Sequence, residues 1–428
     1  MVEAIELLLD ADQWEAAYDL YRLRTHSGQV WKWLPAARLG QRAASAFVAT
    51  PARQQACHAQ LPRNELKHFL AAVGVYGVGG GDLITAREYL EAAAHHFEGP
   101  ANWASRSILL RNLAECLLWL GDVEFARRAA AEAADEAVGD PMQVMKAKTY
   151  QGHMAMVAGD SGVAEGHFLA ADLEHLYIKR GKHLYALGGV WWGEFLARTS
   201  RSGPSRRLTD HNREIVADLG WNEDVARCDR LLARLDMADM DLTTAEQRLT
   251  AAAATFRDGD VLLELAETLP VLAECARASG DLEAAARHVD EALNITGPRG
   301  LLRSHATALT VRARICADQV AAGSRQYVES GRDAADAAHR IATRRQMAWQ
   351  WLDALDAHAR LDQVEGINRG WAQQAATLRA RLTPVELDPD PLATIQRQVT
   401  EKRARGKDYR QGCTPFLPEQ GTTLRSRT

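Results

Sequence analysis

Hydrophobic residues recur along most of this chain with helical spacing, and short polar breaks interrupt the pattern. The segment LAECLLWLGDVEFARRAAAEA (113–133) contains two such helical stretches on either side of a Gly-Asp pair. Glycine adopts the left-handed conformation that ends a helix, and aspartate stabilises the first turn of the next one. The segment therefore predicts two helices joined by a tight turn.

The break recurs at a nearly constant spacing. Gly-Asp pairs occupy 81–82, 121–122, 159–160 and 280–281. Asp241 is a fifth mark, with Met in place of Gly. Successive marks are about 40 residues apart, except for one gap of twice that length. Extrapolation places the missing marks near Arg201 and Ala321, so the chain is predicted to be an array of repeated units.

Small residues flank each mark at fixed positions. Eight residues earlier lie Gly74, Ala114, Gly152, Gly193, Ala233, Ala273 and Ala313. Four residues later lie Ala86, Ala126, Ala164, Ser205, Ala245 and Ala285. The seventh later position is Arg325, where the loop is expected to be longer by about ten residues. Two helices that cross closely leave no room for a side chain larger than methyl, so these positions predict stacked helix pairs.

The resulting prediction is an all-α protein with four regions. Residues 1–63 are expected to hold degenerate helical repeats, with Asp12 and Ala16 in the same relation as mark and small residue. Residues 64–344 form the array, and 345–382 a capping helix pair. Residues 383–428 are expected to be a basic, partly disordered tail with one helix near 391–405, dispensable for folding because no packed core is evident.

The small residue, the Gly-Asp turn and the following Ala resemble the tetratricopeptide repeat, although that family's usual period is about 34 residues. The segments LRNLAECLLWLGD, YALGGVWWGEFL, WNEDVARCDRLLARL and RDAADAAHRIATR are similar to the sensor arrays of actinobacterial STAND-class signalling ATPases. The longer helices also resemble those of kinesin light chains. The resemblance implies a right-handed superhelical solenoid, and a STAND-type ATPase or effector encoded nearby as a partner.

The resemblance also implies a concave groove built from the first helix of each pair. In this family the residue after the small position faces the groove, and so does the residue one helical turn before it. The candidate partner-binding residues are Arg111, Glu115, His153, Glu194, Arg230, Arg234, Glu274 and Arg314. Such charged positions are equally compatible with a solvated face. Their mixture of Arg and Glu argues against a groove dedicated to phosphate or nucleic acid.

Two other features have structural interpretations. Arg198, Arg201, Arg206 and Arg207 cluster around one predicted turn, where we expect a solvated loop rather than a phosphate site. Among the Trp residues, Trp119 and Trp192 fall on first helices of their pairs and are predicted to be core residues rather than ligand-stacking residues.

Composition narrows the function classes. The formal net charge of −5 provides no global attraction for nucleic acid or anionic membranes. The six Cys residues are far apart, as expected for free thiols in a reducing cytoplasm. The acidic N-terminal segment is unlike a signal peptide, and no apolar stretch is long enough to span a bilayer. These features predict a soluble cytoplasmic protein without membrane or nucleic-acid partners.

Motifs for catalysis are not found. The sequence lacks GxxxxGK[ST], HExxH and GxSxG, and its His residues show no metal-ligand spacing. We therefore predict no catalytic, cofactor or metal site. The favoured function is a scaffold or sensor that binds a peptide or protein segment in the groove, in a bacterial regulatory or defence system. The alternative is a small-ligand or peptide-pheromone receptor that changes superhelical pitch on binding.

Overall fold

The computed structural model describes residues 1–24, 37–62, 64–99, 102–179 and 182–404, and these contain helices and turns only. The first helices are α1 (Val2–Asp10), α2 (Trp14–Arg24), α4 (Ala37–Val48), α5 (Pro51–Gln60), α6 (Glu65–Gly80), α7 (Leu83–His96), α8 (Trp103–Trp119), α9 (Val123–Glu136), α10 (Pro141–Ala158) and α11 (Ser161–Ile178). The remainder are α12 (Ala186–Arg198), α13 (Ser202–Asp218), α14 (Asn222–Ala238), α15 (Leu242–Asp258), α16 (Leu262–Ala278), α17 (Leu282–Thr296), α18 (Leu302–Ala321), α19 (Tyr327–Arg344), α20 (Ala348–Glu365), α21 (Trp371–Leu382) and α22 (Pro391–Ala404).

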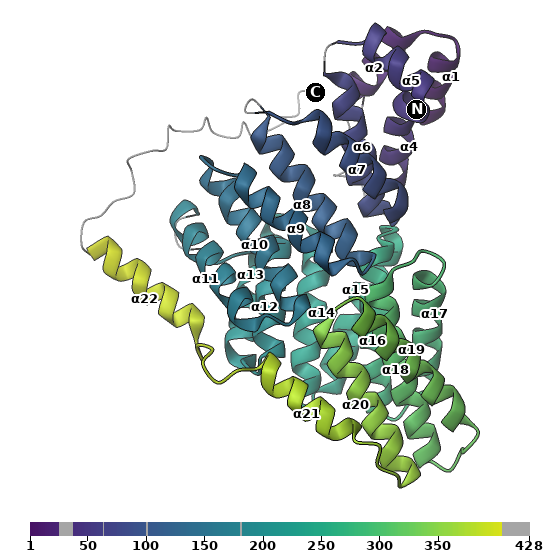
Figure 1. The fold of residues 1–428 in the computed structure, drawn as a ribbon, viewed down its shortest axis with the longest axis vertical. Helices are drawn as coiled ribbons and strands as arrows, with labels where there is room; N and C mark the ends of the chain where they lie inside the picture. The colour runs from purple at the N-terminus through teal and green to yellow at the C-terminus, as the bar shows by residue number, and fades with distance from the viewer. Residues whose placement is uncertain (25–36, 63, 100–101, 180–181, 405–428) are drawn as a thin grey trace, which may run out of the picture.

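From α6 onward the helices form antiparallel pairs, and each pair packs on the next (Figure 1). The stacked pairs make an all-α, right-handed superhelical solenoid of tetratricopeptide-like units, as the sequence predicted. The even-numbered helices α6 to α20 are the first helices of their pairs. The concave surface predicted from the sequence therefore belongs to this even-numbered set.

The small positions lie at helix crossings. All seven small residues that lie eight positions before the marks are buried, and Ala114 is fully inaccessible to solvent. A Cβ atom on Gly74 would lie 2.6 Å from Cγ of Leu90 on the second helix. A Cβ atom on Gly152 would lie 3.1 Å from the Phe168 ring. The steric reason for small residues at these positions is thus confirmed.

The turns share one backbone geometry. At the first six marks the preceding residue is left-handed, with φ of 77° at Gly121, 64° at Ser200 and 65° at Met240. The amide of the next residue donates to a carbonyl five positions back, as in Asp122 N–H to Leu117 O (2.8 Å). This bond and the left-handed residue define a Schellman turn. The extrapolated mark at Arg201 is therefore confirmed.

The same turn also connects one pair to the next. Gly220, Asp260 and Gly300 are left-handed too, so a left-handed residue recurs every twenty positions from Ser200 to Gly300. The sequence marks had located only the turn inside each pair. Two of the turns between pairs contain Gly-Asp as well, at 139–140 and 259–260, but these pairs lie outside the 40-residue register of the marks.

Two positions assigned from the sequence are wrong. In the N-terminal unit Asp12 itself is left-handed (φ 58°), so Gln13 takes the place of the mark. Ala16 is accordingly exposed, whereas Ala17 is fully buried. In the seventh unit α18 runs on to Ala321, and the small residue opposite it is Gly331, whose added Cβ would lie 2.9 Å from Cβ of Cys316. The insertion relative to Arg325 is thus six residues rather than about ten.

Successive turns of the superhelix touch one another. Helices α6, α8 and α10 contact α16, α18 and α20, each five pairs further along the chain. The turn glycines of the first three pairs lie in these contacts. A Cβ on Gly121 would lie 3.0 Å from Cβ of Leu302, and one on Gly159 would lie 2.6 Å from Cβ of Ala348. The indole N–H of Trp349 also donates to Met156 O at 3.0 Å.

The segment after Leu382 packs on the stack as far as α22. Leu176 of α11 forms an apolar cluster with Ile395 and Val399 of α22. Arg207 pairs with Asp390 at 2.7 Å. The expectation that this region lacks packed contacts is wrong for residues 383–399, whereas residues 405–428 lie outside the described structure.

We expect Ile395→Asp to detach α22 from α11, because it would bury a carboxylate in an apolar cluster without a partner. Amide hydrogen exchange in α22 should become faster, while the first seven helix pairs keep their protection, since local units can open independently. The matched control is Gln396→Asp, at the exposed neighbouring position. Unchanged exchange in Ile395→Asp would contradict the observed docking.

Candidate functional site

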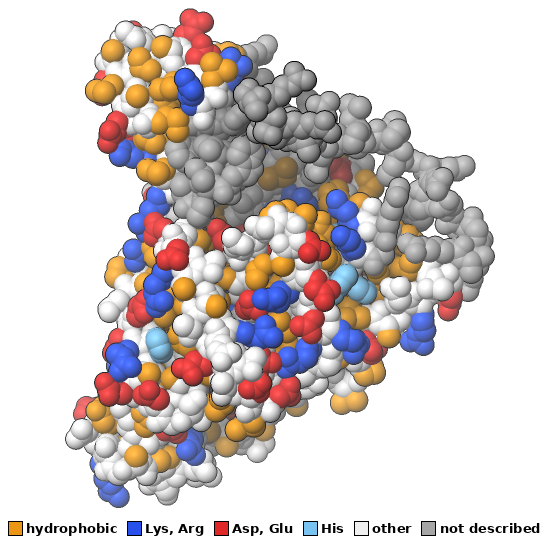
Figure 2. Space-filling view, turned by 180° about the vertical axis from the view of Figure 1, so that it is seen from behind, with side chains coloured by type: hydrophobic (Ala, Val, Ile, Leu, Met, Phe, Trp, Pro, Cys, Tyr) orange, Lys and Arg blue, Asp and Glu red, His pale blue; other side chains and the backbone are white. Residues whose placement is uncertain are grey.

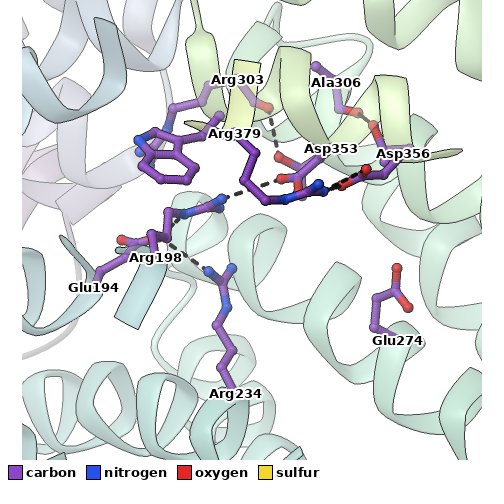
Figure 3. Close-up of polar contacts among 12 residues, drawn as sticks. Glu194, Arg198, Arg234, Glu274, Arg303, Ala306, Asp353, Asp356 and Arg379 are labelled. Atoms are coloured by element: carbon purple, nitrogen blue, oxygen red, sulfur yellow. Dashed lines mark hydrogen bonds and ion pairs between the residues drawn. The ribbon is translucent and has the colours of Figure 1, made fainter. Parts of the chain in front are cut away.

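Several of the charged residues predicted to face inward form ion pairs with one another between neighbouring helix pairs. Arg198 on α12 lies between Glu194 and Asp353 of α20 (Figure 3). Its Nε is 3.5 Å from Glu194 Oε1, and its Nη1 is 3.4 Å from Asp353 Oδ2. Arg234 on α14 approaches the same Glu194 oxygen at 3.2 Å. The closure of the superhelix thus brings α12, α14 and α20 together at one charged centre.

A second set of ion pairs continues from this centre. Arg314 on α18 lies 2.8 Å from Glu274 on α16 and 3.7 Å from Asp353. Arg277 lies 2.6 Å from Glu274. Asp353 is therefore shared by the guanidinium groups of Arg198 and Arg314.

Most of these residues line an open cavity of about 390 Å³, which we call the inner cavity. Its charged lining comprises Glu194, Arg198, Arg234, Glu274, Arg314 and Asp353. Apolar contacts come from Leu231, Pro270 and Val311. In Figure 3 Glu274 lies across an open space from Glu194 and Arg234. The inner cavity therefore offers carboxylates, guanidinium groups and an apolar wall to one occupant.

Electrostatics keep the central carboxylate ionised. Burial would raise the pKa of Glu194, but the positive charges of Arg234 and Arg198 outweigh burial and hold it at about 2. For Arg234 burial outweighs the attraction of Glu194 and lowers the guanidinium pKa. Glu194 is consequently a fixed negative charge, and Arg234 has no other carboxylate within ion-pair distance in the described structure.

Three further candidates line a narrower space beside the inner cavity. Glu115, His153 and Arg230 surround a gap of about 20 Å³ together with Glu194. The Tyr150 hydroxyl donates to Glu115 at 3.1 Å, and burial raises the pKa of Glu115. His153 stacks on Trp191 at 4.2 Å, and burial lowers its pKa to about 3. These side chains line one narrow gap and are packed rather than solvated.

The remaining candidates have separate positions. Arg230 binds Glu264 at 2.8 Å, where Arg227 binds as well. Arg111 lies apart, buried against Gln143, and lines a different cavity. The structure thus places Glu194, Arg234, Glu274 and Arg314 together, Glu115, His153 and Arg230 beside them, and Arg111 elsewhere. Partner binding by these residues stays a prediction.

Sequence reasoning missed two residues of the inner cavity. Arg198 lies one turn after Glu194, so helical spacing offered a signal for it. Asp353 belonged to the expected capping pair, but it lies about one repeat after Arg314, so the 40-residue period offered a signal for it as well. The arginine cluster near the turn is also resolved into separate roles: Arg201 pairs with buried Glu165, and Arg206 with Asp236. A wholly solvated loop is therefore a wrong interpretation.

The predicted core tryptophans are indeed buried, Trp119 at 5% and Trp192 at 0% exposure. Within the described ranges, no three His, Cys, Asp or Glu side chains converge to hold a metal ion. Among the helices of those ranges, none combines the length and apolar character needed to cross a bilayer. On the face shown in Figure 2, basic side chains are interspersed with acidic ones.

No protein-family model and no curated protein matches the chain. Solved structures do match it. The Rap protein complexed with competence and sporulation factor is 14% identical, covers 94% of this chain and 97% of its own, and gives a TM-score of 0.40. BtubC (BKLC) from P. vanneervenii is 16% identical, with coverage of 61% and 92% and a TM-score of 0.28. A circular tandem repeat protein is 13% identical, with coverage of 95% and 96% and a TM-score of 0.17. Each similarity concerns the fold.

Proposed function

We propose that this protein binds a short peptide or a segment of a partner protein in the inner cavity. The observation that carries the proposal is the lining of that cavity by both signs of charge beside an apolar wall. A peptide carries the same combination, because its termini or charged side chains accompany apolar side chains. Pre-arranged charges that pair with each other when the cavity is empty can exchange partners with a bound segment.

The role we propose is that of a sensor or scaffold in a bacterial regulatory or defence system. The resemblance of several segments to STAND-class sensor arrays supports this role, and an ATPase or effector encoded nearby is the proposed partner. The alternative is a receptor for a small ligand or a peptide pheromone. The cavity volume of about 390 Å³ favours this alternative, because it falls within the range of small-molecule pockets.

Peptide selection tests the proposal directly. Heptapeptides selected from a random display library on the immobilised full chain should bind the wild type and lose binding to Ala197→Phe. Ala197 lines the inner cavity, so the added ring occupies the space that the peptide needs. We expect at least a tenfold rise in Kd, measured by fluorescence anisotropy.

The matched control is Ala251→Phe, at an exposed position on α15. It adds the same ring outside the inner cavity and should leave the Kd unchanged. Selected peptides that bind Ala197→Phe as tightly as the wild type would contradict the proposed site. A selection that enriches no peptide, together with saturable binding of a small metabolite lost in Ala197→Phe, would favour the receptor alternative.

A further inference from the structure

A second cavity, of about 610 Å³, lies where the first turns of α10 and α12 meet the end of α11. Its cationic lining consists of Arg111, Lys146 and Lys179, and the described lining residues include no Asp or Glu. This excess of positive charge occurs in a chain whose formal net charge is −5. We call this space the cationic cavity.

Arg111 is the buried cation of this cavity, with 5% of its surface exposed. Its Nη2 donates to Gln143 Oε1 at 2.6 Å and its Nε to Ser107 O at 3.3 Å. Among the described residues it has no carboxylate within ion-pair distance. A buried guanidinium without an anionic partner is costly, because desolvation penalises its charge.

The nearby carboxylates are already engaged. Asp140 caps α10 by accepting from the amides of Met142 and Gln143 at 2.9 and 3.2 Å. Glu115 accepts from the Tyr150 hydroxyl. Asp172 accepts from Leu184 N–H at 2.6 Å and lies 2.7 Å from His183 Nδ1. None of the three lines the cationic cavity, and only Asp140 acts on Arg111 and Lys146 from outside it, so no carboxylate of the described lining faces the cations.

The cations also act on one another. Desolvation lowers the pKa of Lys146, and the positive charges of Arg111 and Lys179 lower it further. Like charges held around a cavity raise the energy of its empty state, and an anion bound between them would lower that energy. The arrangement therefore favours an anionic occupant.

Aromatic side chains supply the other half of the lining. Trp191 lies edge-to-face with Tyr150, with ring centroids 4.9 Å apart. The rings of Tyr185 and Trp221, which also line the cavity, are 6.3 Å apart, and Trp221 is 45% exposed. Aromatic walls of this kind favour flat rings, which stack on or pack edge-to-face against them.

We propose that the cationic cavity binds a small anion that carries a planar ring. A phosphate on a nucleotide and the carboxylate of an aromatic acid are two sources of this chemistry. The site shares no lining residue with the inner cavity, so the inference is independent of peptide binding there.

The test uses 1-anilinonaphthalene-8-sulfonate, a fluorescent planar anion, titrated into the full chain. We expect saturable binding whose Kd rises at least tenfold in the double variant Lys146→Gln/Lys179→Gln. Both lysines are exposed, so the variant should fold. Lys148→Gln, on the same helix but outside the cavity lining, should bind as the wild type does, and so should Ala197→Phe. Equal affinity in the double variant and in Lys148→Gln would overturn the proposal.

Competition then separates the two sources. Displacement of the dye by adenosine monophosphate but not by indole-3-acetate identifies a phosphate site, and the reverse identifies a carboxylate site. Displacement by neither compound would overturn the proposal. Adenosine that competes as well as adenosine monophosphate would also overturn it, because binding would then be independent of charge.

Discussion

Gly159→Ala should destabilise the protein more than any other single methyl addition at its turns. The new Cβ would lie 2.6 Å from Cβ of Ala348 and 2.7 Å from Cδ2 of Leu382, so the contact between superhelical turns must open. Gly159 is also left-handed (φ 86°), which costs a non-glycine residue about 1–2 kcal/mol, and overpacking typically adds about 1–3 kcal/mol. We expect a loss of about 2–4 kcal/mol in the free energy of unfolding, measured by urea denaturation.

Gly280→Ala provides the matched control. Its φ of 87° is almost the same, but an added Cβ would meet no atom within 4 Å. Both variants therefore pay the same conformational cost, and only Gly159→Ala disturbs the contact between turns. Equal losses in the two variants would show that the turns of the superhelix do not press on one another in solution.

Glu194→Ala should cost about 2 kcal/mol, because removing one partner of a half-buried ion pair leaves the other charge without its carboxylate. Arg234 would lose its carboxylate, while Arg198 would keep Asp353. The pKa of Glu194 is held at about 2, below its usual value of 4.5. Its contribution to stability is therefore present above pH 4.5 and is lost as the pH falls toward 2. Chemical denaturation of wild type and variant at several pH values measures both effects.

Glu291→Ala is the comparison for this result. Glu291 pairs with Arg257 at 2.8 Å, but both side chains are more than a third exposed, so the loss should stay below about 1 kcal/mol. If Glu194→Ala costs no more than Glu291→Ala at pH 7, the inner ion pairs are hydrated and contribute little. A difference between wild type and Glu194→Ala that persists unchanged at pH 3 would contradict the assigned pKa.

The fold was largely predictable because the repeat carries its own steric signature. Gly152 has to be small because the ring of Phe168 on the second helix lies against it, and a close contact of this kind recurs in each unit. The turns between pairs were missed because their sequences vary: Gly220 and Gly300 lack a following Asp, and Gly259-Asp260 lies outside the register of the marks. Gln346 is a non-glycine residue with positive φ. The same property of Asp12 shifted the assignment of Ala16 by one residue.

The sequence indicated which helix face carries the candidate residues, but not which side chains they would contact. Helical spacing placed Glu194, Arg234 and Arg314 on one face of the first helices, and all three line the inner cavity. It could not show that the cavity closes, since Arg198 and Asp353 lie four pairs apart in the chain and meet only through the superhelical curvature. Glu115, expected to be an exposed charge, is instead hydrogen-bonded inside the stack. Curvature depends on small rotations summed over many units, which no single motif encodes.

The contacts of Gly81, Gly121 and Gly159 with the following superhelical turn should make the molecule resist extension more than an open solenoid does. An open solenoid stretches by small rotations at every interface, with force shared along its length. Here a force that pulls the two ends apart acts first on the three contacts between superhelical turns, and the superhelix extends only after these contacts break. Glycine at Gly121 and Gly159 thus allows the close approach of successive superhelical turns, and a single added methyl group there would push these turns apart.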